Sequence, residues 1–113
     1  EAGHLLARAA ARLGLAGVAF RPAWFHTAHM AHRAGMHFVD PARQGRYEAL
    51  LRDLADLPLL EATRAIAERR VLLDEAPYTW EADAMVHWID ERPYDDAATR
   101  RERERVRFTL SSA

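Results

Sequence analysis

The chain has 113 residues, half of them apolar, and its sixteen arginines nearly balance seventeen acidic residues to give a net charge of −1. This length suits one domain with a single core, and the near-neutral charge provides no general attraction to nucleic acid or to an anionic membrane. There is no cysteine, which excludes disulfides, zinc–thiolate sites and thiol nucleophiles. No apolar run approaches the roughly 18 residues that a membrane span needs, so we expect a cytoplasmic protein.

Four helices are predicted in the first part of the chain, each from apolar residues at helical spacing and from signals at its ends. Asp40 and Pro41 are the clearest signal, because aspartate caps a helix and proline suits its first position. Glycine suits the other end of a helix. The four predicted helices lie at residues 4–13, between Pro22 and Gly35, from Asp40 to just before Pro58, and at 59–69.

Extended structure is predicted after the fourth helix. The stretch RVLLDEAPYTW, in which VLL is followed by the turn-like DEAP, predicts a small hairpin or extended loop over residues 71–80. A fifth helix is predicted at about 81–91, with Met85 and Trp88 on its apolar side. Near the end of the chain, apolar and polar residues alternate in RVRFTL, as they do in a half-exposed strand.

These elements predict a mainly α fold: about five short helices around one core, with a minor β-hairpin near residues 71–80 and a C-terminal strand as a further element. The alternative is an α+β fold, which would follow if the short apolar stretch GVAF pairs with RVRFTL in one small sheet. In both cases we expect a single domain over residues 1–113, with 95–113 either ordered or a partly ordered tail.

The stretch FHTAHMAHRAGMH contains four of the six histidines of the chain. At about 100° per residue, His26, His29 and His32 fall on one face of the second helix. An arc that includes Trp24 and Met30 falls on the opposite face, which we therefore expect to be buried. The histidines are accordingly predicted to form the polar, solvated face of this helix. If that face met a partner, the imidazoles would change charge together between roughly pH 5 and 7 and weaken the contact.

A metal site is the alternative role of these histidines. Side chains three residues apart on a helix can chelate one divalent ion, and a complete site needs ligands from elsewhere in the chain. The candidate ligands are His26, His29, His37 and His87. None of them belongs to an established motif such as HExxH. The cofactor expected under this alternative is a divalent metal such as zinc, and no other cofactor is expected.

The stretch AIAERRVLLDEAP is similar to the helix and hairpin of S4-type RNA-binding domains, through an apolar residue, a basic-Val pair and a turn at like spacing. This resemblance implies RNA binding through the hairpin, with Arg69 and Arg70 beside it. Arg105 and Arg107 near the C-terminus would add positive charge. Arg69 and Glu75 stand where that family has turn glycines, and without glycine a tight turn is strained. Nearby acids also make this surface mixed in charge.

Large aromatic side chains follow the predicted hairpin and continue beyond it: Tyr78, Trp80, Trp88 and Tyr94. Aromatic residues at the edge of a small domain are typical of contact surfaces. We therefore expect a non-enzymatic protein-interaction or regulatory domain that self-associates or binds another protein through these four residues. Metal binding by the histidine-rich helix is the alternative function, and nucleic-acid binding is the third.

No catalytic residues are predicted. Serine occurs only at Ser111 and Ser112, so no nucleophile stands near a predicted base, and the five glycines form no phosphate-binding loop.

Overall fold

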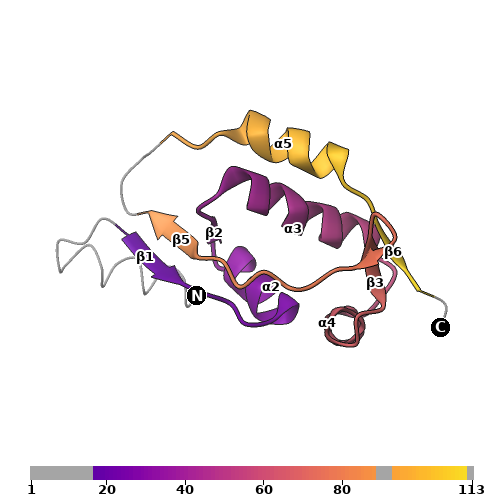
Figure 1. Cartoon of the computed structure of the whole chain (residues 1–113). Helices are drawn as coiled ribbons and strands as arrows, with labels where there is room; N and C mark the ends of the chain where they lie inside the picture. Colours follow the sequence, from indigo (N-terminus) through magenta and orange to yellow (C-terminus); the bar gives the residue numbers. More distant parts are fainter. Residues whose placement is uncertain (1–16, 89–92, 112–113) are drawn as a thin grey trace.

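The computed structural model describes residues 17–88 and 93–111, and within them the fold is α+β, with four helices and two three-stranded antiparallel sheets (Figure 1). One sheet has the strand order β1-β5-β2 and the other β4-β3-β6. The two sheets lie at opposite ends of α3, which forms the middle of the molecule. The elements in chain order are β1 (Gly17–Phe20), α2 (Phe25–Arg33), β2 (His37–Phe38), α3 (Pro41–Asp53), α4 (Leu59–Ala67), β3 (Val71–Leu73), β4 (Ala76–Pro77), β5 (Met85–Trp88), α5 (Asp96–Arg105) and β6 (Phe108–Leu110).

The mainly α class predicted from the sequence is wrong, and the error lies in the predicted helix at 81–91. Residues 81–84 form neither helix nor strand, and Met85–Trp88 forms the central strand of the first sheet. Residues 89–92 lie outside the described part. Met85 and Val86 are both buried, with 0% and 2% exposure. A strand that is covered on both faces buries consecutive residues, so a short apolar run fits a buried strand as well as a helix.

Several other predictions are confirmed. The Asp40 carboxylate accepts a hydrogen bond from the Ala42 N–H at 3.0 Å, so α3 begins as expected, although it ends at Asp53. A hairpin joins β3 to β4, and the C-terminal strand β6 pairs with β3. GVAF forms β1, but it belongs to the other sheet and does not pair with β6. The predicted helix at 4–13 lies outside the described residues.

The buried face of α2 differs from the predicted one. Phe25, Ala28 and Ala31 are buried, whereas Met30 is 64% exposed and Trp24, just before the helix, is 51% exposed. The helix packs against α4, and Phe25 contacts the buried Tyr47 ring of α3 with 6.0 Å between centroids. The bulk of Phe25 thus determines which face turns inward, and part of the predicted apolar face is left at the surface.

Helix α5 lies along α3 (Figure 1). The contact depends on Gly45, which is buried in the middle of α3. A Cβ at Gly45 would collide with the Thr99 carbonyl oxygen and would lie 2.8 Å from the Glu102 Cβ. Only a residue without a side chain allows the two backbones to approach so closely.

Candidate binding groove

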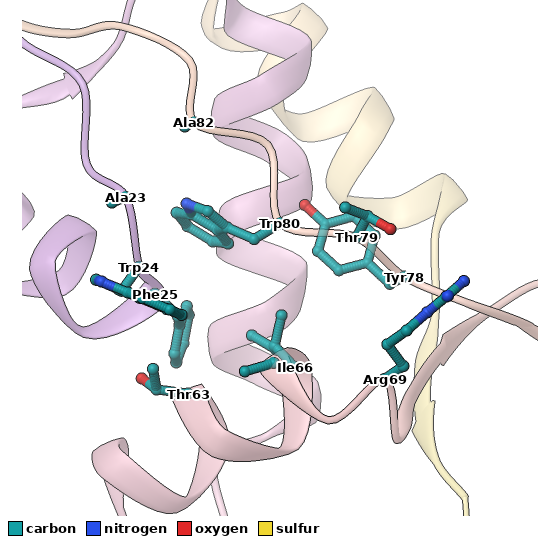
Figure 2. A pocket seen from close by; sticks show the side chains of 11 residues that line it. Ala23, Trp24, Phe25, Thr63, Ile66, Arg69, Tyr78, Thr79, Trp80 and Ala82 are labelled. Atoms are coloured by element: carbon teal, nitrogen blue, oxygen red, sulfur yellow. The ribbon is translucent and has the colours of Figure 1, made fainter.

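A groove with a volume of about 570 Å³ lies between α2, α4 and the extended chain that follows β4. Figure 2 shows its lining side chains, which come from three separate parts of the sequence. The volume falls within the range of about 300–1,000 Å³ that is usual for ligand sites. The lining residues are Ala23, Trp24, Phe25, Thr63, Ile66, Ala67, Arg69, Tyr78, Thr79, Trp80 and Ala82.

Trp24 forms one end of the groove, and its backbone is held in place. Its N–H donates to the Thr27 hydroxyl at 3.1 Å, and that hydroxyl donates back to the Trp24 carbonyl oxygen at 2.8 Å. The first bond gives a partner to the Trp24 N–H, which the helix itself leaves without one. The Trp24 carbonyl oxygen also accepts from the Ala28 N–H of the helix at 3.1 Å. The indole, in contrast, is 51% exposed. A bound apolar group could therefore cover indole surface that is now in contact with water.

Trp80 forms a rigid wall. Its indole N–H donates to the Pro22 carbonyl oxygen at 3.0 Å, and its ring meets the Phe25 ring edge-on with 6.0 Å between centroids. The guanidinium of Arg43 lies 4.6 Å from the Trp80 ring centroid and 4.2 Å from that of Phe38. Arg43 is completely buried, so this cation–π contact is shielded from water and is correspondingly strong.

The same arginine holds the extended chain that carries Trp80. Arg43 Nη2 donates to the Glu81 carbonyl oxygen at 2.9 Å, and Arg46 donates to both Glu81 carboxylate oxygens at 3.0 and 2.7 Å. The Tyr78 hydroxyl donates to the same carboxylate at 2.9 Å. Burial alone would raise the pKa of Glu81, but the Arg46 hydrogen bond, the Arg43 charge and the Tyr78 hydroxyl together lower it. These interactions hold residues 78–84 in the connection between β4 and β5, and residues 81–84 of it lie where the sequence pattern suggested a helix.

Arg69 forms the other end of the groove (Figure 2). It follows α4 with φ of 61°, in the left-handed region. The Arg69 N–H donates to the Ile66 carbonyl oxygen at 3.0 Å, and the Arg70 N–H donates to that of Ala65 at 2.9 Å. This pair of bonds is the Schellman motif, in which the left-handed position is normally glycine.

Of the four aromatic residues predicted to form a contact surface, two line this groove and two lie elsewhere. Tyr78 and Trp80 line the groove, although Tyr78 is only 6% exposed. Trp88 lies in β5 and Tyr94 before α5, and neither lines the groove. The Tyr94 hydroxyl donates to the Phe38 carbonyl oxygen at 2.5 Å, and its ring packs on that of His37. Tyr94 therefore has a structural role in joining the chain before α5 to β2.

The candidate metal ligands lie on three elements: His26 and His29 on α2, His37 on β2 and His87 on β5. Within residues 17–88 and 93–111, no three metal-ligating side chains come together. His29 Nδ1 instead lies 3.5 Å from the Tyr47 hydroxyl. Burial, with the charges of Arg33 and His32, lowers the pKa of His29. The geometry therefore gives no basis for proposing a metal centre in this part of the chain.

The arginines considered for nucleic acid are largely paired with acids. Arg70 contacts Glu68 at 2.9 Å, Arg105 contacts Glu102 at 2.8 Å, and Arg107 lies 3.8 Å from Asp53. Arg69 lines one end of the groove. The surface beside the hairpin is consequently mixed in charge, unlike a basic nucleic-acid footprint.

The chain matches no protein-family model, no curated protein sequence and no solved structure. None of the helices in the described residues is both long enough and apolar enough to cross a membrane. Sequence reasoning did not find the α2 and α4 side of the groove, because Trp24 was assigned to a buried helix face. Gly35 after α2 and Pro58 before α4 mark boundaries of the two helices, but they do not show that the helices meet.

Proposed function

We propose that this domain is a protein-interaction module that binds an apolar side chain of a partner polypeptide in the groove between α2, α4 and residues 78–82. The observation that carries the proposal is a concave, mainly apolar groove with the half-exposed Trp24 indole at one end. Burying one large apolar side chain in such a place contributes about 1.5–3 kcal/mol. Aromatic residues in a pocket are also the usual centre of binding energy in protein interfaces.

The rigidity of the walls supports binding. Trp80 is fixed by its bond to Pro22, by the Phe25 ring and by the buried Arg43. A groove that already has its bound shape loses little conformational entropy when a partner enters, so more of the contact energy appears as affinity. The described residues that line the groove include no histidine and no carboxylate. We therefore propose binding and not catalysis.

Selection of a random peptide library on the immobilised full chain tests the proposal. We expect the selected peptides to share an aromatic or leucine side chain and to change the tryptophan fluorescence of the protein on titration. Ala67→Gln fills the groove from the exposed end of α4 and should weaken binding at least about tenfold, which corresponds to about 1.4 kcal/mol.

Leu60→Gln is the matched control for that experiment. Leu60 is 66% exposed on the same helix and does not line the groove. Equal loss of binding in the two variants would mean that the peptides bind elsewhere on α4. Sedimentation over a concentration series shows whether the partner is instead a second copy, which would agree with the self-association expected from the sequence.

A further inference from the structure

We propose that Arg69 anchors a carboxylate of the bound polypeptide, so that the groove takes a segment in which an acidic group lies beside an apolar side chain. This inference rests on the proposed function and adds the chemistry of the partner. Among the described residues that line the groove, Arg69 is the only charged one. Figure 2 shows its side chain beside Tyr78, at the end opposite Trp24.

The guanidinium of Arg69 is unpaired in the described part of the chain. No carboxylate of residues 17–88 or 93–111 lies within ion-pair distance of it, although Arg70 contacts Glu68 at 2.9 Å. Arg69 is also exposed. Its charge is therefore free to meet an anionic group that enters the groove.

The backbone of Arg69 has positive φ, as do those of Asp74 and Glu75, and of these three residues only Arg69 lines the groove. Its φ of 61° belongs to a position at which glycine is favoured, because a Cβ is crowded there. A residue held in such a conformation destabilises the fold unless its side chain contributes something in return. Within the described residues the Arg69 side chain makes no hydrogen bond or ion pair that offsets this cost. A contact between the Arg69 side chain and a ligand would offset the cost of this backbone conformation.

Guanidinium and carboxylate are complementary in shape as well as in charge. The planar fork of arginine donates two parallel hydrogen bonds to one carboxylate, and these bonds are shorter and stronger than those between neutral groups. Polypeptides carry carboxylates on aspartate and glutamate and at the chain end. Beyond Arg69 the groove is apolar, so the neighbouring residue of the ligand should be aromatic or aliphatic.

Three synthetic peptides test the inference by titration against the intact chain, with tryptophan fluorescence as the readout. They are acetyl-Gly-Leu-Phe-Glu-Gly-amide, its Gln analogue, and acetyl-Gly-Leu-Phe with a free terminal carboxylate. We expect at least one carboxylate peptide to bind about tenfold more tightly than the Gln analogue at low salt. That preference should disappear in Arg69→Gly and should persist in part in Arg69→Lys. The carboxylate peptide that loses affinity in Arg69→Gly identifies the source of the anion.

Stability provides the second readout. Arg69→Gly should raise the midpoint of thermal unfolding, since glycine suits the left-handed position, while it abolishes the carboxylate preference. Glu75→Gly is the matched control, because Glu75 has φ of 68° in the β3–β4 turn and does not line the groove. It should also raise the midpoint but leave peptide binding unchanged.

The outcomes are distinguishable. Equal affinity of all three peptides for the unmodified chain overturns the role of Arg69 and leaves the proposed function intact. Loss of the carboxylate preference in Glu75→Gly as well as in Arg69→Gly also overturns it, since the effect then comes from the changed backbone. No measurable binding of these peptides, together with no binder from the peptide library, overturns the proposed function itself.

Discussion

The face formed by α3 and α5 and the groove between α2 and α4 use arginine in opposite ways. On the first, Arg46 contacts Glu81 at 2.7 Å and Glu102 at 3.0 Å, and Arg103 is paired with Glu48. In the groove, Arg69 contacts no carboxylate of the described residues, and Trp24 is half exposed. In the first region these arginines pair with acids of the same molecule and so help to hold the fold together. The second retains unused charge and apolar surface, which is the condition for binding something else.

Arg43 connects the two regions, and its removal should have the largest effect. Arg43→Ala removes the guanidinium donors from the Glu81 carbonyl oxygen, which keeps only the Asp83 N–H at 2.8 Å, and opens a cavity between the Phe38 and Trp80 rings. We expect a loss of about 3 kcal/mol in the free energy of unfolding, measured by urea denaturation. Because Trp80 loses its support, peptide binding to the folded protein should weaken as well. Unchanged binding would show that the groove keeps its shape without Arg43.

Gly45→Ala should disturb the first region and spare the second. The added Cβ would meet the Thr99 carbonyl and the Glu102 side chain, so α5 must move away from α3. We expect a loss of about 2 kcal/mol in urea denaturation, with peptide affinity unchanged. Ala67→Gln is the control, with an expected change below about 0.5 kcal/mol because Ala67 is exposed. A loss of affinity in Gly45→Ala would mean that the two regions are coupled through α3.

Acid should weaken the attachment of residues 78–84 through Glu81. The pKa of this carboxylate in the folded protein lies below its ordinary value of 4.5. Its contribution to stability is therefore complete above that pH and is lost as the pH falls through the folded-state pKa. The test range is pH 5 to pH 3, about one unit either side of an ordinary carboxyl pKa. Over this range the midpoint temperature of thermal unfolding should fall more steeply for the unmodified chain than for Glu81→Gln. Other acidic residues titrate in both proteins, so they lower both midpoints equally. Parallel plots of midpoint against pH would therefore contradict a contribution from Glu81.

The smallest expected effect is a gain of stability in the β3–β4 turn. Asp74 and Glu75 both have positive φ, at 53° and 68°, in a turn type that favours glycine at the second position. Glu75→Gly should stabilise the domain by about 0.5–1 kcal/mol, measured by urea denaturation. Glu75→Ala retains the crowded Cβ and should not reproduce the gain. A gain of equal size in both variants would indicate that the glutamate side chain, and not the backbone, is the source of strain.

Local signals predicted those elements whose geometry depends on neighbouring residues. Asp40 and Pro41 located the start of α3, and the turn-like stretch DEAP located the hairpin. The strain expected without glycine is present there as positive φ at Asp74 and Glu75. These features involve contacts between residues a few positions apart. They can therefore be recognised in any short window of the sequence.

The failures concern contacts between distant residues. Met85 and Trp88 are three residues apart, which suits a helix, but Met85 pairs with Phe20 on one side and Phe38 on the other. The second helix turned Phe25 inward and left Met30 exposed. In both cases tertiary packing overrode a local periodicity that was too short to decide between two structures.

By itself the sequence determined the neutral charge, the lack of cysteine chemistry, the cap of α3, the hairpin with its strained turn and the C-terminal strand. Only the tertiary structure decided that α2 and α4 enclose a groove and that the buried Arg43 supports its Trp80 wall. It also decided that Arg69, at the end of the groove, contacts no carboxylate of residues 17–88 and 93–111. The physical reason is sequence separation. Caps and turns depend on bonds within a few residues. The groove instead arises from packing between separate segments, and the Arg43–Glu81 contact that supports it joins residues 38 positions apart.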